Sequence, residues 1–443
     1  MLWARQSVPS KEKAQRQIKA ELLLDGVALL GVDALGPGDG DLAFGLDFLI
    51  SEAASRGLPY VSANLANREG TLVFPESLVV KRAGLKIGIT SVLSDELHVA
   101  GGRVLPTRSS LKAVVAKLRA LDQLDLVLVL SHLGLTADKS LPHEVPGIDL
   151  IFGGHSRSHQ EEPVLVGDTA IFQAGSRGKH LGQVTLSMRE AGVGWFDPGS
   201  QVRVGAQREH LVEQIRDYKV QLAALLPENE SKRTRLEKVV EFSQRRLDAL
   251  PKPSPESSTS NLLKSEKIPL NRGLDDHKEM AVLVDAALKR LGPEGRLTGH
   301  EGHNHGHGAA TPKPKVRTYG DFVGAEACKA CHQGQYKDWS TTRHAHAYAT
   351  LVKERRHFDL DCWSCHVTGA NLKGGPSGPY DVGPMRNVQC ESCHGAGRQH
   401  VANPSVDMVR VPSEELCKSC HSDEQTEGRF EYSSYLPRVD HVH

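Results

Sequence analysis

Four copies of one five-residue pattern lie in the last third of this chain and constrain its fold. Each copy reads Cys-x-x-Cys-His, and together they use all eight cysteines: Cys328, Cys331 and His332; Cys362, Cys365 and His366; Cys390, Cys393 and His394; Cys417, Cys420 and His421. In this pattern the two thiols form thioethers with a porphyrin, and the adjacent histidine is the proximal iron ligand. We therefore predict four covalently bound haem c groups. Two cysteine-rich zinc ribbons are the less favoured alternative, because zinc sites do not require a histidine after every second cysteine.

Charge and hydropathy argue against a nucleic-acid partner and against a membrane-spanning segment. Lys plus Arg and Asp plus Glu number 54 each, so we expect no nucleic-acid partner. No apolar run approaches the ~20 residues of a membrane span, so we predict no transmembrane segment. The first ten residues lack the apolar core of a signal peptide. Because haem c is attached after export, we expect a periplasmic or extracellular location, with the signal removed or encoded upstream of this start.

The first part of the chain alternates strand-like and helical segments, which predicts an α/β domain over residues 1–205. Residues 125–130 are apolar without alternation, as in a buried parallel strand. Further strands are expected at 149–152 and 170–173, and helices at 10–31 and 108–121.

Residues 206–291 predict a connector built from helices. Leu211, Ile215, Tyr218, Leu222 and Leu225 have heptad spacing, which indicates an antiparallel helical hairpin. We expect it to act as a packed connector, or alternatively as a dimerisation arm. A linker is expected at 251–261 and a last helix at 275–291.

Residues 292–318 predict a Gly/His/Pro-rich linker. The stretch contains His300, His303, His305 and His307, and metal binding there is the less favoured interpretation.

Residues 319–443 predict a mainly helical and irregular multihaem module. Four haems leave this short segment too little protein for an apolar core of its own, so the porphyrins would form the core. Electrons would pass between neighbouring haems. Histidines outside the four motifs are candidate distal ligands: His344, His346, His357, His400, His441 and His443.

This module resembles the tetrahaem cytochrome c family of nitrifiers, which includes the electron acceptor of hydroxylamine oxidoreductase. The resemblance rests on Tyr319–Cys328, the segment from Trp339 to Ala347, Cys390–Gly397 and His441. It implies three haems with two histidine ligands each and one five-coordinate haem. By position, His400 would serve the first haem, His344 the third and His441 the fourth. The second haem, on His366, would lack a protein distal ligand unless His346 supplies one.

The α/β domain resembles the 5'-nucleotidase branch of the calcineurin-like metallophosphoesterases. The resemblance rests on Ser131–Gly134, Gly153–Arg157 and Phe172–Gly182. It implies a truncated α/β sandwich and a two-metal site, of which His132, His155 and Asp39 remain as candidate metal ligands. Two motif positions depart from the family, since Gly40 replaces the catalytic histidine and Arg157 replaces a metal-binding one. His159 is a candidate substitute ligand, and with Arg157 it could alternatively bind an anion.

Together these patterns favour a multihaem cytochrome that relays electrons between redox partner proteins. The α/β domain would be an inactive scaffold or a docking module, and a divalent metal retained there is the less favoured alternative. The other functional hypotheses are a metal-dependent phosphoesterase fused to a cytochrome, and a haem-based reductase of a small nitrogen oxide.

Overall fold

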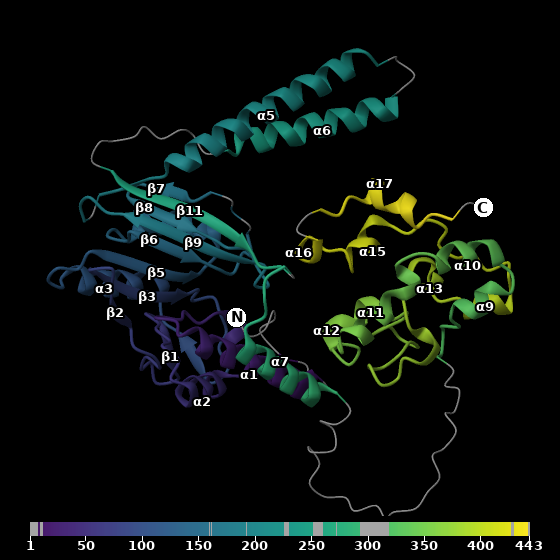
Figure 1. Ribbon diagram of the computed structural model, residues 1–443, viewed down its shortest axis with the longest axis horizontal. Helices are drawn as coiled ribbons and strands as arrows, with labels where there is room; N and C mark the ends of the chain where they lie inside the picture. The colour runs from purple at the N-terminus through teal and green to yellow at the C-terminus, as the bar shows by residue number, and fades with distance from the viewer. Residues whose placement is uncertain are drawn as a thin grey trace, which may run out of the picture. The chain divides into compact units, whose positions relative to one another are not determined.

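The chain is described here by a computed structural model, and its elements are shown in Figure 1. The described residues are 8, 12–158, 160, 162–191, 193–225, 230–250, 260–271, 273–292, 319–426 and 429–441. His159, His443, the linker histidines at 300–307 and most of the two expected linkers lie outside these ranges.

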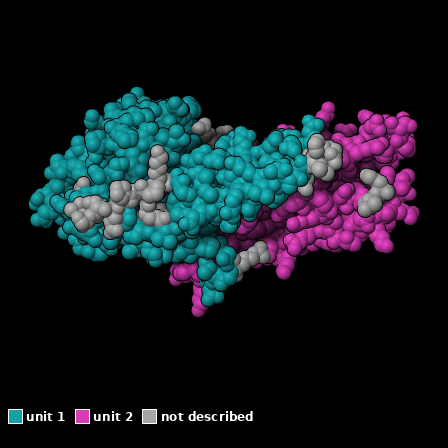
Figure 2. All heavy atoms as spheres, turned by 90° about the horizontal axis from the view of Figure 1, so that it is seen from above, with its two compact units in different colours: residues 1–8, 23–276 teal, residues 9–22, 277–443 magenta. Residues whose placement is uncertain are grey.

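The chain divides into two compact units (Figure 2). Unit 1 comprises residues 1–8 and 23–276, and unit 2 comprises residues 9–22 and 277–443. This division differs from the boundaries expected from the sequence. Residues 9–22 were expected in the α/β domain and the helix near 275–291 in the connector, but both belong to the unit that carries the four motifs.

A six-stranded sheet forms the centre of unit 1. Its order is β2 (Ser77–Arg82), β3 (Leu85–Leu93), β5 (Leu126–His132), β6 (Leu150–Gly153), β8 (Thr169–Phe172) and β7 (Val164–Val166). The inner strands β3, β5, β6 and β8 are parallel, whereas β2 and β7 pair antiparallel at the two edges. The expected parallel α/β domain is therefore confirmed.

Both faces of this sheet are covered, which explains the unbroken apolar run in β5. On one face Val127 and Val129 pack against α3 (Thr107–Arg119) and α4 (Leu135–Glu144). On the other face Leu126 packs with a second sheet of β10 (Trp195–Phe196), β11 (Asn261–Pro269) and β9 (His180–Ser187). Successive side chains of a strand point to opposite faces, so both sets must be apolar.

Strand β11 was not expected from the sequence. It pairs antiparallel with β9 from Leu262 opposite Ser187 to Pro269 opposite His180. Its residues Lys264, Glu266 and Lys267 give it a polar composition that hides the strand pattern.

A smaller lobe of unit 1 carries the turn that holds Asp39. It consists of α1 (Lys13–Leu30), η2 (Asp39–Leu42), α2 (Leu46–Arg56), β1 (Leu65–Asn67) and β4 (Gly102–Val104), although residues 13–22 of α1 belong to unit 2. Leu42, Leu46, Leu49 and Leu65 form its apolar core. Within this lobe Leu35 and Tyr60 form an isolated parallel bridge.

The expected hairpin is present as α5 (Pro198–Ala223) and α6 (Glu230–Asp248), which pack against each other. Leu211 and Ile215 of the expected heptad seam are buried.

Unit 2 consists of short helices and irregular chain. They are α7 (Lys278–Leu291), α9 (Ala325–Lys329), α10 (Gln333–Ser340), η3 (His344–His346), α11 (Ala347–Lys353), α12 (Leu360–His366), η4 (Gly383–Met385), α13 (Cys390–His394), α14 (Arg398–Ala402), α15 (Glu414–Lys418), α16 (Asp423–Thr426), α17 (Tyr432–Tyr435) and η5 (Leu436–Arg438). The expectation of no apolar core needs correction, because a small one surrounds Trp363, which is 1% exposed. Within the described ranges, no helix is long and apolar enough to cross a membrane.

Candidate functional sites

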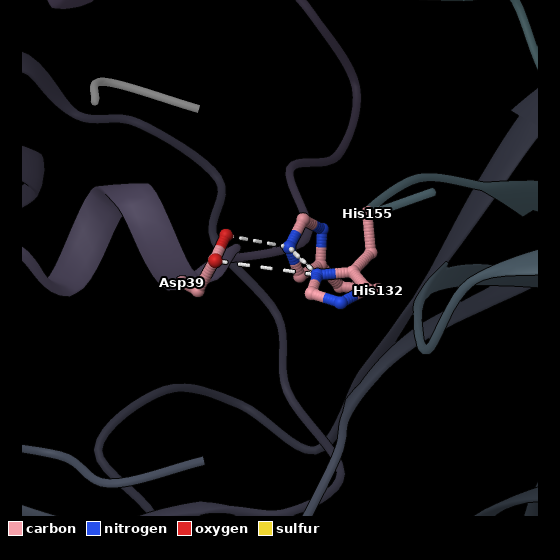
Figure 3. Close-up of side chains that lie close together, drawn as sticks. All are labelled: Asp39, His132 and His155. Carbon is pink, nitrogen blue, oxygen red and sulfur yellow. Dashed lines mark hydrogen bonds and ion pairs between the residues drawn. The ribbon is translucent and has the colours of Figure 1, made fainter. Parts of the chain in front are cut away.

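Three side chains expected at a metal site converge beside the carboxyl ends of the inner parallel strands of the unit 1 sheet (Figure 3). His132 is the last residue of β5, His155 follows β6, and Asp39 opens η2. His132 Nε2 lies 2.8 Å from Asp39 Oδ1 and 3.4 Å from His155 Nδ1. His155 Nδ1 lies 4.0 Å from Asp39 Oδ2. Each residue thus offers one ligand atom to a common point, at the strand ends where parallel sheets place their sites.

The backbone around His132 leaves room for its ring and for little else. A Cβ atom on Gly38 would lie 3.0 Å from His132 Cε1, and one on Gly154 would lie 3.1 Å from His132 Nδ1. His155 and Arg157 adopt positive φ angles of 68° and 54°, which non-glycine residues rarely do. Such conformations persist where the surroundings fix them, and they cluster at functional sites.

A buried hydrogen-bond network, which the sequence did not reveal, supports the same strand ends. Asp138 is 0% exposed and accepts hydrogen bonds from Ser131 Oγ at 2.5 Å and Gln173 Nε2 at 3.3 Å. Gln173 Oε1 accepts one from Ser156 Oγ at 2.8 Å. Burial raises the pKa of Asp138. The network ties the ends of β5 and β8 to the loop that carries His155.

Asp39 is the acidic group of this site. The hydrogen bond from His132 lowers the pKa of Asp39, although partial burial acts in the opposite direction. Gly40 N–H also donates to this carboxylate at 2.9 Å. Asp39 is therefore ionised at neutral pH and presents a full charge to a cation.

The residues present fit one metal ion and not two. Among the residues that the structure describes, Asp39, His132 and His155 are the single group of three or more metal-ligand side chains that converge. Gly40 has no side chain, and Arg157 is a cation at the position where the resembling enzymes have a histidine. A two-metal clamp needs ligands on both sides of the reacting phosphorus, and this set supplies one side.

In unit 2, each Cys-x-x-Cys-His copy lies on or beside a short helix. The second and third copies lie within α12 and α13. The first and fourth copies begin in α9 and α15 and continue into the turn after each helix. A helical turn brings the two cysteines and the following histidine to one side.

Three pairs of histidine rings face each other across similar gaps. The ring centres are 6.2 Å apart for His332 and His400, 6.1 Å for His344 and His421, and 5.7 Å for His394 and His441. An iron bound by two imidazole nitrogens at about 2 Å each would separate the ring centres by roughly 6 Å. Each pair joins one motif histidine to one expected distal histidine.

These ring pairs differ in one part from the sequence expectation, and we therefore propose a different assignment of two distal histidines. His400 faces the first motif histidine, His332, as expected. His344 faces His421 of the fourth motif instead of His394 of the third, and His441 faces His394 instead of His421. The order of histidines along the chain does not reveal this exchange, because it depends on contacts between segments that are distant in sequence.

Hydrogen bonds orient several of these rings for metal binding. The Nδ1 atoms of His366, His394 and His400 lie 2.7, 2.5 and 2.7 Å from the carbonyl oxygens of Ala347, Val409 and Val406. A carbonyl only accepts, so each Nδ1 carries the proton and Nε2 keeps its lone pair. Metal-binding histidines commonly have this second hydrogen bond. Burial lowers the pKa of both His344 and His421, which favours the neutral form that binds metals.

His366 of the second motif has no such partner in the described part of the chain. His344 lies near enough to interact electrostatically with it but faces His421. His346 is exposed, and the His357 ring lies against Phe358, tilted by 46°, with 3.9 Å between ring centres. Neither forms the kind of ring pair seen for the other three motifs.

Thiols of different motifs lie close together. The Cys390 thiol lies close enough to Cys328 to raise the pKa of Cys328, and the Cys365 thiol raises the pKa of Cys420 in the same way. The pKa of Cys393 is raised to about 11, mainly because the thiol is buried. The nearby thiol of Cys417 raises this pKa further by electrostatic repulsion. The attachment points of the first and third motifs, the second and fourth, and the third and fourth are therefore neighbours.

Comparisons with known proteins give each unit separate relatives. Residues 327–395 match the family model of cytochrome c554 and c-prime. Cytochrome c-554 of Nitrosomonas europaea is 27% identical over 157 residues, which cover 27% of this chain and 67% of that protein.

The other relatives resemble the α/β part. An apyrase of Tabanus yao is 30% identical over 37% of this chain and 34% of its own length. A 5'-nucleotidase of Vibrio cholerae is 24% identical over 38% of this chain and 37% of its own length. The chain thus spans about a third of these relatives. A solved 5'-nucleotidase precursor of Thermus thermophilus has a TM-score of 0.36 at 23% identity, covering 40% of this chain and 39% of that chain.

The cytochrome match covers three of the four motif copies and implies covalently bound haem c, and with it a periplasmic or extracellular location. The chain therefore combines a cytochrome c554-like part with a part similar to 5'-nucleotidases.

Proposed function

We propose that this protein is a tetrahaem c-type cytochrome that relays electrons between periplasmic or cell-surface redox partners. The observation that carries the proposal is the set of three facing histidine pairs, each joining a motif histidine to a distal one. An iron with two histidine ligands has no free position for substrate, so it suits electron transfer. Haem c would supply iron that takes up and releases one electron at a time.

The positions of the four attachment motifs would determine the order in which electrons pass between the haems. The neighbouring thiols connect the motif of His332 to that of His394, His394 to His421, and His421 to His366. We propose that electrons follow this order or its reverse, with His332 and His366 at the two ends. The backbone carbonyls that accept from Nδ1 would hold each ring in place while the iron changes charge.

The α/β unit would serve as a scaffold or docking module and not as a two-metal phosphoesterase. Among the described residues one ligand set converges, which supports this, as does the cation at Arg157. We expect no turnover of nitrophenyl phosphate or nucleotides with added manganese. Turnover that disappears in a His155→Ala variant would contradict this assignment.

The experiment that tests the cytochrome proposal is a haem count on the exported, full-length protein. A pyridine haemochrome assay is expected to give four haems per chain, and reduced-minus-oxidised spectra are expected to show that all four accept electrons. A colourless protein with zinc or disulfides at the cysteines would refute the proposal.

A second candidate function rests on His366, which has no facing imidazole in the described residues. Its haem would have an open position able to bind a small nitrogen oxide. Electron paramagnetic resonance is expected to show one high-spin haem among four, and that signal is expected to change when nitric oxide is added. Four low-spin haems would exclude this candidate.

A further inference from the structure

The third attachment motif contains a buried acidic residue. Glu391 lies between Cys390 and Cys393 and is 3% exposed. Among the described residues, its hydrogen-bond partners are backbone N–H groups, and no lysine or arginine forms an ion pair with it. We propose that Glu391 is a positioning residue that ties the first and third haem attachment sites together, and that its buried negative charge lowers the reduction potentials of both haems. This inference rests on the cytochrome proposal above and assigns one side chain a role within it.

Glu391 joins the two attachment sites through hydrogen bonds to both of its carboxylate oxygens. Val323 N lies 3.0 Å from Oε1 and 3.1 Å from Oε2, and Gly324 N–H donates to Oε2 at 2.7 Å. Gly397 N–H donates to Oε1 at 2.7 Å. Val323 and Gly324 directly precede α9, which carries Cys328, whereas Gly397 lies in the turn after α13. One carboxylate therefore holds the start of the first attachment helix against the end of the third.

This contact reaches the first attachment cysteine through one glycine. Gly324 caps α9 with a φ of 83°, and its carbonyl oxygen lies 3.7 Å from Cys328 Sγ. Gln389, which precedes Cys390, accepts a hydrogen bond from Ala325 N–H at 2.5 Å. Side chains on both sides of Cys390 thus hold the segment that leads into α9. The separation of the first and third attachment sites depends on these bonds.

The charge of Glu391 is expected to act on both haems. A charge in the protein interior interacts more strongly than an exposed one, because the interior has a lower dielectric constant and is less screened by salt. The pKa of Cys328 is raised by the neighbouring Cys390 thiol, by burial and by the negative charge of Glu391, so this charge acts at the first attachment site as well as at its own.

A buried anion favours the oxidised form of a haem, because that form carries one more positive charge than the reduced form. Net charge and burial around the iron are among the features by which a protein sets a reduction potential. Glu391 therefore lowers the potentials at the His332 end of the proposed route. This biases electron flow away from that end and toward the haem on His366.

The test is a redox titration of the full-length haem-loaded protein, followed by visible absorbance. Glu391→Gln keeps the size of the side chain and removes its charge. We expect two of the four midpoint potentials to rise, each by about a tenfold change in the ratio of reduced to oxidised haem, which is ~59 mV for one electron. The other two potentials should move less, and the number of haems and their spin states should not change.

The matched control is Glu326→Gln, which makes the same change of charge beside the first motif. Glu326 lies two residues before Cys328, but its side chain is 75% exposed. Because solvent and salt screen an exposed charge, this variant should keep all four wild-type potentials. Glu391→Asp, which keeps the buried charge on a shorter side chain, should keep them too.

Four unchanged potentials in a Glu391→Gln protein with four haems, or an equal rise of all four, would overturn the proposal. If Glu391→Gln does not retain four haems, Glu391→Asp decides. Wild-type potentials in that variant would support the proposal, whereas raised potentials or a loss of haem there would overturn it and leave Glu391 a purely structural role. A wild-type protein without redox-active haem would instead refute the cytochrome proposal itself.

Discussion

Replacing His344 with alanine is expected to convert the haem on the fourth motif, and not the third, from low spin to high spin. His344 faces His421 with ring centres 6.1 Å apart, whereas His394 faces His441 at 5.7 Å. Removing an axial imidazole leaves the iron five-coordinate, which weakens the ligand field. The electron paramagnetic resonance spectrum should gain one haem equivalent of high-spin signal, and the visible spectrum should change accordingly.

A combined variant identifies which haem is affected. Changing Cys417 and Cys420 to alanine removes the fourth attachment point and should leave three haems. In that background, the His344→Ala substitution should add no further high-spin signal, because the haem it serves is gone. A full extra equivalent of high-spin signal there would place His344 on the third haem, as the sequence alone had suggested.

The matched control for this experiment is His346→Ala. His346 lies two residues away in the same turn, is exposed, and faces none of the motif histidines within the described residues. It should leave the spin states unchanged. If His346→Ala instead increases the high-spin signal, then His346 is an iron ligand, and its expected iron is that of the haem on His366.

The sequence predicted the parts of this protein that short-range rules determine. Each Cys-x-x-Cys-His motif contains both attachment cysteines and the proximal histidine within five residues, so it can be recognised without knowledge of the fold. Strand β5 was recognisable because both of its faces are buried, which removes polar residues from it. His132 and His155 were identified by the local motifs that carry them, and the structure places His132 at the end of β5 and His155 two residues after β6.

The features that the sequence did not predict depend on contacts between segments that are distant in the chain. His344 and His421 are far apart in the chain, and no local pattern states which distal histidine faces which motif. The Asp138 network joins residues of α4, of β5 and of the loops that follow β6 and β8, and each of these residues looks ordinary in isolation. Strand β11 depends on β9 for its hydrogen bonds, and its charged residues gave no apolar signal of their own.

The contact between the N-terminal helix and the second motif is of the same long-range kind and has a large expected effect. In unit 2, Gln15 Nε2 donates to Phe358 O at 2.8 Å, and Leu360 N–H donates to Gln15 Oε1 at 2.8 Å. Lys19 forms ion pairs with Asp359 and, at 2.5 Å, with Asp361. Arg16, which is 6% exposed, pairs with Asp361 as well. Residues 15–19 therefore hold the start of α12, the helix that carries Cys362, Cys365 and His366.

A Lys19→Met variant is expected to destabilise unit 2 by about 3 kcal/mol, because it leaves a buried carboxylate without its nearest cation. Asp359 is 4% exposed and also caps α12 by accepting from Asp361 N–H at 2.9 Å. Arg356 remains 3.7 Å away, which places the loss at the lower end of the range for broken buried pairs. Denaturant unfolding followed by Soret absorbance, which reports the haem-bearing unit, should show a lower midpoint. Lys13→Met, an exposed lysine on the same helix, is the control and should leave the midpoint unchanged.

The stability difference between wild type and Lys19→Met is expected to narrow in acid. Burial alone would raise the pKa of Asp361, but Arg16 and Lys19 outweigh it and lower that pKa below its ordinary value. A carboxyl with a depressed pKa in the folded state stabilises the protein above its unfolded pKa of about 3.9, and this contribution is lost as the pH falls through the folded value. Unfolding measured from pH 7 down to pH 3 should therefore show the wild type losing more stability than the variant. A pH-independent difference would mean that Lys19 acts through packing of its aliphatic chain and not through its charge.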